Sequence, residues 1–518
     1  MKRFTCAEGD GLVLGNVLSA KAAKRKLWLA IVAVTGLAIL TSGAGSALAA
    51  PVSAKVFDVK GFGAAGTGAA NDSPAIDRAV SAANRAGGGI VEFRSGTYLA
   101  AGTVHLKSNV TIKVDPGATI TGAGSGYDAP EPNPYDKYQD FGHSHFHDAM
   151  FFGDKVDNVT FTGGGTIDGG GHLITGNPKS GQADKIISLT RCTNLTLSGI
   201  TLKRGGHFAA LINGCTGVTS DHLTISTASD RDGWNIISTQ NVKITNINDA
   251  ANDDALVFKS DYALGAKLPN GHVTVTGAHL SAGCCNALMF GSETCGDFTD
   301  YNFDQITITG AGKSGLGMVS MDGAVISDVH YRDITLSGTK SPIMQKIGTR
   351  KRCGNSPGVG SIHDITYDNI TGTNAGSLSP TLWGEAGSNQ IRNVTFTNVN
   401  LTLPGGNGTM STGVPSNNPN DYNPTSIGTR PAYGWYLHNV DGIKFVNSSV
   451  RFSKDDGRPS VIANTGGAVV FDHFVAQRGG NSPSDLLFQN VTGYCVTGGA
   501  NTSGGALRVG STGSTAGC

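Results

Sequence analysis

Asn241-Val-Lys-Ile-Thr-Asn246 is a short run in which apolar Val and Ile alternate with polar residues. Such alternation is typical of a β-strand that buries one face. Similar runs recur about 23 to 36 residues apart, more where loops intervene. Examples are Asn109-Val-Thr-Ile112, Asn158-Val-Thr-Phe161, Asn194-Leu-Thr-Leu197 and Asn393-Val-Thr-Phe396.

No helix-length pattern separates these runs. Repeats of this length, built from short strands and turns, predict an all-β fold, a single right-handed parallel β-helix in which each coil stacks on the one before. A β-propeller is the competing all-β fold, but its blades need four antiparallel strands and a longer regular period.

The start of the chain is predicted to be a leader. Residues 1–50 contain a charged stretch at 21–26, an apolar run at 27–40 and a small-residue cleavage site at 47–49, which is the pattern of an export signal. A membrane anchor is the alternative, but the apolar run is short. We therefore expect a secreted, extracellular protein whose residues 51–518 form one β-helix catalytic domain, without membrane contact after cleavage.

A short helix is predicted to cap the first coil. Ser73 and Pro74 suit the N-cap and first position of a helix, and Ile76, Ala79 and Val80 give it an apolar stripe. Two loop insertions are expected farther along, near residues 123–150 and 402–432. Loops that project from a regular scaffold commonly carry specificity.

The amino-acid composition argues against a nucleic-acid-binding protein and against a disordered one. The 518 residues include 75 glycines, only 15% are charged, and the net charge is zero. Nothing basic points to nucleic acid, and nothing strongly acidic points to disorder. We expect a monomer without a cofactor, whose partner is a polysaccharide.

Eight cysteines follow the leader, an even number that suits disulfides in an exported protein. Cys192 and Cys215 occupy similar places in successive repeats, so stacking predicts that they pair. A second predicted pair is Cys495 with Cys518. The connectivity of Cys284, Cys285, Cys295 and Cys353 stays open. Zinc is the alternative, but adjacent Cys284 and Cys285 lack the usual two-residue ligand spacing, and no metal is expected.

Three carboxylates occur in two successive repeats. Asp232 lies in Asp230-Arg-Asp-Gly-Trp-Asn235, and Asp253 and Asp254 lie in Asn252-Asp-Asp-Ala-Leu-Val-Phe-Lys-Ser260. Stacked coils would bring them together on one face. Sugar hydrolysis needs such a cluster, because one carboxylic acid protonates the leaving oxygen while another carboxylate activates water. The alternative is that surface turns are simply rich in Asp.

The first insertion carries His143, His145 and His147 at alternate positions, beside several aromatic residues. On a strand these histidines would share one face. They could bind sugar, hold a metal, or pack within the loop. We select His143 and His145 as candidate sugar contacts.

At these residues the sequence resembles glycoside hydrolase family 28, the polygalacturonase-like β-helix enzymes, from about Phe57 to the region near Phe445. The family's Asn-Thr-Asp-Gly motif is similar to Arg231-Asp-Gly233, where only Asp and Gly persist. Its Gly-Asp-Asp motif resembles Asn252-Asp-Asp254, followed by a matching Lys259-Ser260. Its Gly-His-Gly motif falls at Cys285-Asn-Ala287, so that Asn286 replaces His.

The resemblance implies an inverting glycosidase that hydrolyses a cell-wall polysaccharide, pectin-like or less acidic. Asp253 would be the general acid, and Asp232 and Asp254 would position the attacking water. The chain must bend for both Asp253 and Asp254 to reach the cleft, since neighbouring strand residues point to opposite faces. Inversion predicts carboxyl groups about 6.5–9.5 Å apart.

The family's Arg-Ile-Lys motif, which holds a uronate carboxylate, falls at Gly317-Met-Val319, so both cations are missing. Either another cation replaces them, with Lys259, Lys313 and Lys346 as candidates, or the sugar at the cleavage point is not galacturonate, which we favour. Glu293 could bind sugar hydroxyls or be a surface carboxylate. Trp234 could stack on a sugar or belong to the core.

Two other functions fit the same scaffold. A polysaccharide lyase would need a base near calcium-held uronate, and no matching basic motif is found. A non-catalytic carbohydrate-binding protein would have kept the fold after losing the His and Arg-x-Lys motifs. Substitution of Asp232 and Asp253 separates these functions, because only a hydrolase would lose activity.

Overall fold

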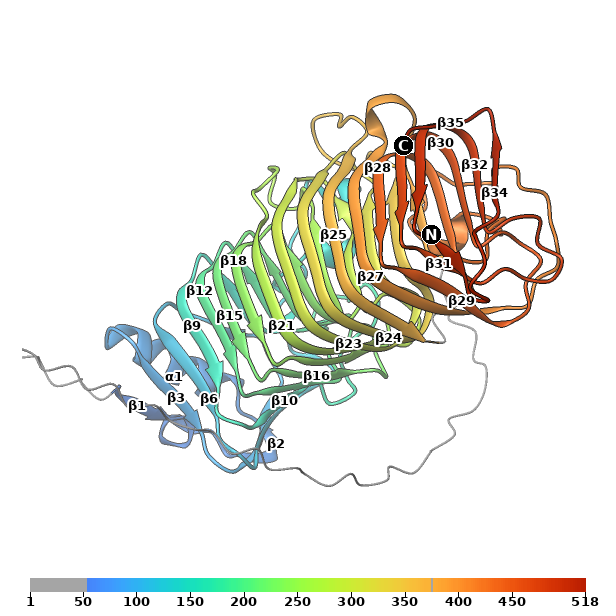
Figure 1. Ribbon diagram of the computed structural model, residues 1–518. Coiled ribbons are helices and arrows are strands. Elements are labelled where there is room, and N and C mark those ends of the chain that lie inside the picture. The colour runs from blue at the N-terminus through green and yellow to red at the C-terminus, as the bar shows by residue number, and fades with distance from the viewer. Residues whose placement is uncertain (1–53, 374–375) are drawn as a thin grey trace, which may run out of the picture. The chain divides into compact units, whose positions relative to one another are not determined.

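The computed structural model describes residues 54–373 and 376–518. Short strands follow one another in stacked coils (Figure 1). β17 (Asp232–Ile237) pairs in parallel with β14 (Phe208–Asn213) of the preceding coil and with β20 (Leu256–Ser260) of the next. The right-handed parallel β-helix predicted from the repeats is confirmed.

Three parallel ladders run along the described coils. The first ladder contains β5 (Val104–His105), β8 (Ala149–Asp154), β11 (Lys185–Thr190), β14, β17, β20, β22 (Leu288–Thr294), β26 (Thr381–Trp383) and β34 (Val509–Thr512). The second contains β1 (Val56–Asp58), β3 (Gly89–Phe93), β6 (Val110–Val114), β9 (Asp157–Thr162), β12 (Thr193–Ser198), β15 (Thr216–Asp221), β18 (Gln240–Thr245) and β35 (Thr515–Ala516).

The third ladder contains β2 (Thr67–Asn71), β4 (Gly96–Ala100), β7 (Ala118–Gly122), β10 (Thr166–Asp168), β13 (Thr201–Lys203), β16 (Thr224–Thr227), β19 (Asn248–Ala251), β29 (Ser449–Lys454), β31 (Val475–Ala476) and β33 (Ala500–Asn501). Longer strands continue from one ladder into the next. They are β21 (Gly271–Ala282), β23 (Phe298–Ser320), β24 (Val325–Ile347), β25 (Ser361–Thr373), β27 (Ile391–Gly405), β28 (Trp435–Val446), β30 (Val461–Asp472) and β32 (Leu486–Thr497).

The recurring Asn of the sequence repeat has a structural cause. Asn109, Asn158 and Asn194 have φ values of 65°, 55° and 57°, a left-handed conformation that Asn tolerates better than most residues. Their side chains also form a ladder, in which Asn158 Nδ2 donates to Asn109 Oδ1 at 2.7 Å and Asn194 Nδ2 donates to Asn158 Oδ1 at 3.1 Å. Each Asn therefore turns the chain and binds the coil before it.

The core is a column of apolar side chains inside the coils. Rings at equivalent positions stack one coil apart, with centroid separations of 5.0, 4.7, 4.9 and 4.6 Å. The stack runs through Phe303, Tyr331, Tyr367, Phe396 and Phe445. These spacings match the separation of about 4.8 Å between paired strands, so the repeat itself sets the packing.

α1 (Ser73–Arg85) lies beside the first strands, as Figure 1 shows, and buries Ile76, Ala79 and Val80. The predicted capping helix is therefore confirmed, but its N-cap is Asp72 and not Ser73. The Asp72 carboxylate accepts hydrogen bonds from the backbone of Ala65, at 2.6 Å, and of Gly66, at 3.3 Å. It thus ties the helix start to the preceding turn.

Both predicted insertions leave the regular coils. The first carries the 3₁₀ turns η2 (Asp136–Tyr138) and η3 (Phe141–His143), and the second, which starts inside β27, carries η5 (Pro424–Ser426). Two other 3₁₀ turns are η1 (Val59–Phe62) and η4 (Gly387–Asn389). The predicted leader, residues 1–50, lies outside the described residues. Among the described residues, no helix is long and apolar enough to cross a membrane.

The structure forms both predicted disulfides, Cys192–Cys215 and Cys495–Cys518. It also pairs Cys295 with Cys353, which resolves part of the connectivity left open by the sequence. Cys284 and Cys285 are chain neighbours whose Sγ atoms lie 2.9 Å apart. The pair lies in the turn that leads from β21 into β22.

Candidate active site

The three predicted acids lie on neighbouring coils of the first ladder. Asp232 is the first residue of β17, whereas Asp253 and Asp254 precede β20 in a bent segment between β19 and β20. The expected bend is therefore present. Asp232 and Asp254 are buried, and Asp253 is half-buried.

Gly233, beside Asp232, has a steric reason to be glycine. A Cβ atom at this position would lie 2.2 Å from Oδ1 of Asp249, which points into the core from β19. Burial raises the pKa of Asp249 to about 8. A larger residue at 233 would displace this buried carboxyl group and, with it, the start of β17.

Asp253 is held by a cation that the sequence reasoning missed. Its Oδ2 accepts from Arg231 Nη2 at 2.9 Å and from Arg231 Nε at 3.2 Å. Burial by itself would raise the pKa of Asp253, but Arg231 and Lys313 outweigh it and lower this pKa to about 2. In the free protein Asp253 is thus a stabilised carboxylate.

Asp254 is positioned by Asn286 and Lys259. Asn286 donates to Asp254 Oδ1 through its side-chain nitrogen at 2.7 Å and its backbone nitrogen at 3.1 Å. Lys259 Nζ lies 3.8 Å from Asp254 Oδ2. Burial nevertheless raises the pKa of Asp254, and the neighbouring Asp253 charge raises it further. Asn286 is completely buried, so here it orients the acid.

Among the described residues, the Asp232 carboxylate has one side-chain hydrogen-bond partner, Asn235, whose Nδ2 donates to its Oδ2 at 3.0 Å. Burial and then the charge of Asp253 raise the pKa of Asp232 well above its usual range, whereas Arg231 opposes them. The cluster therefore combines one stabilised carboxylate with two carboxyl groups that retain protons more readily. Such an arrangement contains both a proton donor and a base, as glycoside hydrolysis requires. The lowered pKa of Asp253 in the free protein is opposite to the protonated state that its predicted role as general acid needs.

Glu293 is almost fully buried, at 1% exposure, and is not the surface carboxylate considered as an alternative. It accepts from Lys259 Nζ at 3.2 Å and from Arg352 Nη2 at 2.5 Å. Burial opposes its ionisation, but Lys259, His143 and Arg352 lower the pKa of Glu293 well below its usual range. Glu293 and Lys259 together form an ion-pair network next to Asp254.

The two selected histidines have different surroundings. His143 Nδ1 lies 3.7 Å from Glu293 Oε2, and burial lowers the pKa of His143 to about 3. His145 is instead held inside its own loop, where it stacks on Phe141 and contacts Asp136. His143 thus borders the acid cluster, whereas the prediction that His145 contacts sugar is not supported by its position.

Trp234 requires a correction. Its side chain is fully buried in the apolar core of the column. The structure does not place it where a sugar ring could stack.

The cations considered as replacements for the missing Arg and Lys are already engaged. Lys346 Nζ donates to Asn417, Asn418, Asp421 and Ser426 of the second insertion at 2.7 to 2.8 Å. Lys313 Nζ donates to Tyr422 Oη at 2.8 Å. In the place of the missing motif, Val319 is buried in an apolar cluster with Val257, Met289 and Met321, against which Tyr422 packs.

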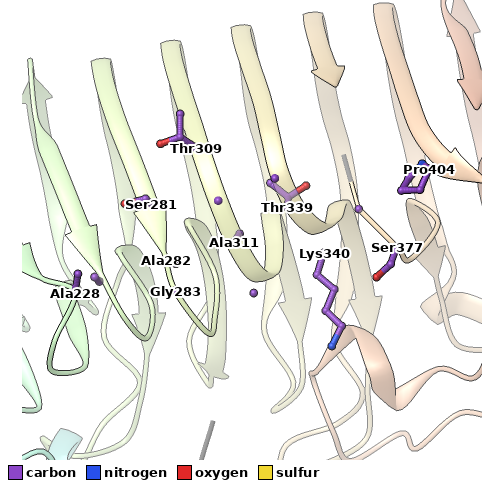
Figure 2. Close-up of a pocket in the computed structure, with 15 residues that line it drawn as sticks. Ala228, Ser281, Ala282, Gly283, Thr309, Ala311, Thr339, Lys340, Ser377 and Pro404 are labelled. Atoms are coloured by element: carbon purple, nitrogen blue, oxygen red, sulfur yellow. The ribbon is translucent and has the colours of Figure 1, made fainter. Parts of the chain in front are cut away.

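A groove of about 640 Å³ crosses the turns of several successive coils and is lined by residues between Ala228 and Pro404. Figure 2 shows small side chains such as Ser281, Thr309 and Thr339 along it, with Lys340 at one side. Its lining contains none of the predicted site residues. The groove is therefore a different surface from the acid cluster.

Within the described residues, two groups of three side chains could hold a metal ion. One comprises Asp253, Cys284 and Cys285, and the other Asp140, His143 and Glu293. The carboxylates of both groups already pair with an arginine, Asp253 with Arg231 and Asp140 and Glu293 with Arg352. Only the first group offers sulfur.

Sequence reasoning missed Arg231, Arg352, Asn235 and Tyr422. Arg231 stands next to Asp232 in the acid motif, so its position was a usable signal. Arg352 and Tyr422 come from segments more than a hundred residues away from Asp232, and only folding brings them near.

Lys259→Met is expected to lower the free energy of unfolding by about 3–5 kcal/mol, because it removes the buried cation that lies between the carboxylates of Asp254 and Glu293. Urea unfolding at neutral pH measures the effect. Lys243→Met, on an exposed position of β18, is the matched control. Equal midpoints for the two variants would contradict the proposed role of Lys259 as the cation of the network.

The chain resembles known proteins over most of the β-helix. Residues 94–420 match glycosyl hydrolases family 28. An endo-polygalacturonase of Pectobacterium carotovorum subsp. carotovorum is 26% identical over 331 residues, which is 60% of this chain and 78% of the relative. An exopolygalacturonase of Zea mays is 24% identical over 343 residues, 62% of this chain and 77% of the relative.

Among solved structures, the family 28 exopolygalacturonase of Yersinia enterocolitica matches with a TM-score of 0.53 and 18% identity, over 78% of this chain and 76% of that chain. This likeness supports the fold. The match to the family covers more than half of the chain and includes the acid cluster. The chain therefore belongs to glycosyl hydrolases family 28 and is a glycosidase that hydrolyses O-glycosyl bonds.

Proposed function

We propose that the protein is a secreted, inverting hydrolase that removes sugars from the ends of a pectic polysaccharide. The observation that carries the proposal is the cluster of Asp232, Asp253 and Asp254, bordered on both sides by an insertion. Polygalacturonases among the relatives support the substrate class. The relatives include both endo- and exo-acting enzymes, so they do not distinguish attack inside the polymer from attack at its end. The proposed attack at chain ends depends on the two insertions.

The first insertion borders the site on the side of β14. Gly142 packs so closely on His207 and Phe208 that a Cβ atom there would lie 2.7 Å from the Phe208 ring. Asp140 reaches across to Arg352 at 2.6 Å. The insertion is also anchored to the segment that follows β20, because Asn133 Nδ2 donates to the Ala263 carbonyl at 3.0 Å.

The second insertion borders the site on the side of β23 and β24. It surrounds Lys346 Nζ with oxygen atoms, and the Thr349 backbone donates to the Pro419 carbonyl at 2.8 Å. Tyr422 covers Val319. The strands β17, β20 and β22 lie between these two borders in the first ladder, and at about 4.8 Å per strand they make a short stretch for a polymer. A site of this length favours attack at a chain end.

We propose that the sugar at the cleavage point has no free carboxylate, because the Arg and Lys that hold such a carboxylate in the family are missing here. Val319 is apolar, and Lys313 and Lys346 are bonded to the second insertion. A uronate placed there would lose water without gaining a cation, which is costly. Rhamnose-containing or neutral pectic polymers therefore suit the site better than polygalacturonate.

The product distribution tests the mode of attack. We expect reducing sugar to appear with little loss of viscosity, and short products to dominate from the first minutes. Tyr422→Ala is expected to weaken the border and to increase longer products, with Tyr494→Ala, in the last coils, as the control. A rapid fall in viscosity with the unmodified protein would show internal cleavage instead.

The substrate and stereochemistry are tested with residues 51–518 and a panel of polygalacturonate, rhamnogalacturonan, arabinan and galactan. We expect activity on a mixed or neutral polymer that is lost in Asp253→Asn, and inversion of the anomeric carbon by NMR. Efficient hydrolysis of polygalacturonate would overturn the substrate proposal. Polymer binding without hydrolysis would indicate the carbohydrate-binding alternative.

A further inference from the structure

Two sulfur atoms lie beside the predicted general acid. The Sγ atoms of Cys284 and Cys285 are 2.9 Å apart, and both lie within 4.8 Å of a carboxylate oxygen of Asp253. Cys285 is buried, whereas Cys284 and Asp253 are half-buried. The three side chains therefore form a cluster that a small ion could reach from the side of Asp253 and Cys284.

The backbone fixes this cluster between two coils. Cys284 N donates to the Asn252 carbonyl at 2.6 Å, and Lys313 N donates to the Cys285 carbonyl at 2.9 Å. Gly312 packs against Cys284 so closely that a Cβ atom there would lie 2.5 Å from the Cys284 backbone. Asp253 is oriented by Arg231 through Oδ2. The cysteine backbone and the carboxylate are thus positioned before any ligand binds.

We propose that Asp253, Cys284 and Cys285 form a binding site for a soft divalent cation of the zinc type. Two thiolates and one carboxylate suit such a cation, whereas calcium and magnesium prefer oxygen ligands. Three protein ligands leave a fourth position for water or a sugar hydroxyl. The spacing of the two cysteines in the sequence argued against zinc, because it did not include Asp253. The stacked coils bring Asp253 beside the cysteines as a third ligand.

Binding has a direct chemical consequence. Both thiols lose their protons when they ligate the cation, so two protons are released. The sulfur atoms must also separate from 2.9 Å, because bonds of about 2.3 Å to one zinc ion in tetrahedral geometry hold them farther apart. The bound carboxylate of Asp253 can no longer accept and deliver a proton. An occupied site is therefore an inhibited hydrolase.

Cadmium is the probe, because its bonds to thiolates absorb in the ultraviolet. The protein is prepared without metal, and its thiols are mapped by alkylation and mass spectrometry before titration. We expect alkylation to show Cys284 and Cys285 in the reduced thiol form, and titration to give one cadmium ion per chain with a new thiolate absorbance. Cys285→Ser is expected to weaken binding by more than about tenfold, since even second-shell partners contribute about 10–100-fold.

Asp253→Asn tests the carboxylate ligand and is expected to weaken binding while keeping the thiolate absorbance. Asp140→Asn, in the other ligand group, is the matched control and is expected to leave binding unchanged. A disulfide between Cys284 and Cys285 in the protein as isolated would overturn the proposal, and so would equal affinity in Cys285→Ser. The binding readout does not depend on hydrolysis, so a wrong substrate assignment would leave this test intact.

Discussion

Asp253→Asn is expected to lower kcat by about 10²–10⁴-fold, the range that a positioned general acid contributes. The amide keeps the shape of the side chain but cannot deliver a proton to the leaving oxygen. Because Asp232 and Asp254 are predicted to position the same water, their Asn variants are expected to give similar losses, and the double variants to lose little more. Initial rates on the best polymer of the panel measure the effect.

Asp230→Asn is the matched control, because Asp230 belongs to the same motif but its carboxylate accepts from the Gly206 backbone and not from a group that contacts the three acids. We expect this variant to keep its kcat. Thermal unfolding shows whether each variant is folded, which matters for Asp253→Asn because Arg231 loses an ionised partner. A folded Asp253→Asn protein with unchanged kcat would remove Asp253 from the mechanism.

Arg231→Gln is expected to move both limbs of the pH profile of kcat/KM to higher pH. Arg231 lowers the pKa of Asp253 and also opposes the raised pKa of Asp232. Its removal raises both pKa values, and an opposite charge at this distance typically contributes about 1–3 units. The acid then keeps its proton to higher pH, and the base needs a higher pH to lose one.

This profile is measured on the free enzyme, since kcat/KM reports the ionisations of free enzyme and substrate. Arg204→Gln is the control, because Arg204 forms a comparable pair with Asp168, with Nη2 to Oδ2 at 2.6 Å. We expect its profile to match that of the unmodified protein. If Arg231→Gln shifted neither limb, Asp253 would not be the acid whose ionisation limits the reaction.

The repeat of Asn and alternating β-branched residues was enough to predict the coils, because the period of the pattern and the left-handed Asn turn are local properties. The capping helix and two disulfides followed from the same reasoning, since equivalent positions of successive coils become neighbours. The three acids also followed, because their motifs lie one coil apart. Their catalytic roles stay predictions that the variants above test.

Tertiary structure decided the surroundings of these acids. Trp234 and Asp232 are two residues apart, and strict alternation of a strand would send both to one face. The fold instead places Trp234 in the apolar core and Asp232 in the acid cluster, where it is bonded to Asn235. Arg352 and Tyr422 arrive from distant segments, so no spacing in the sequence could predict their contacts with Glu293 and Lys313. The sequence by itself thus determined the scaffold and the acids, whereas the ionisation of those acids was decided by burial and charge, which depend on the whole fold.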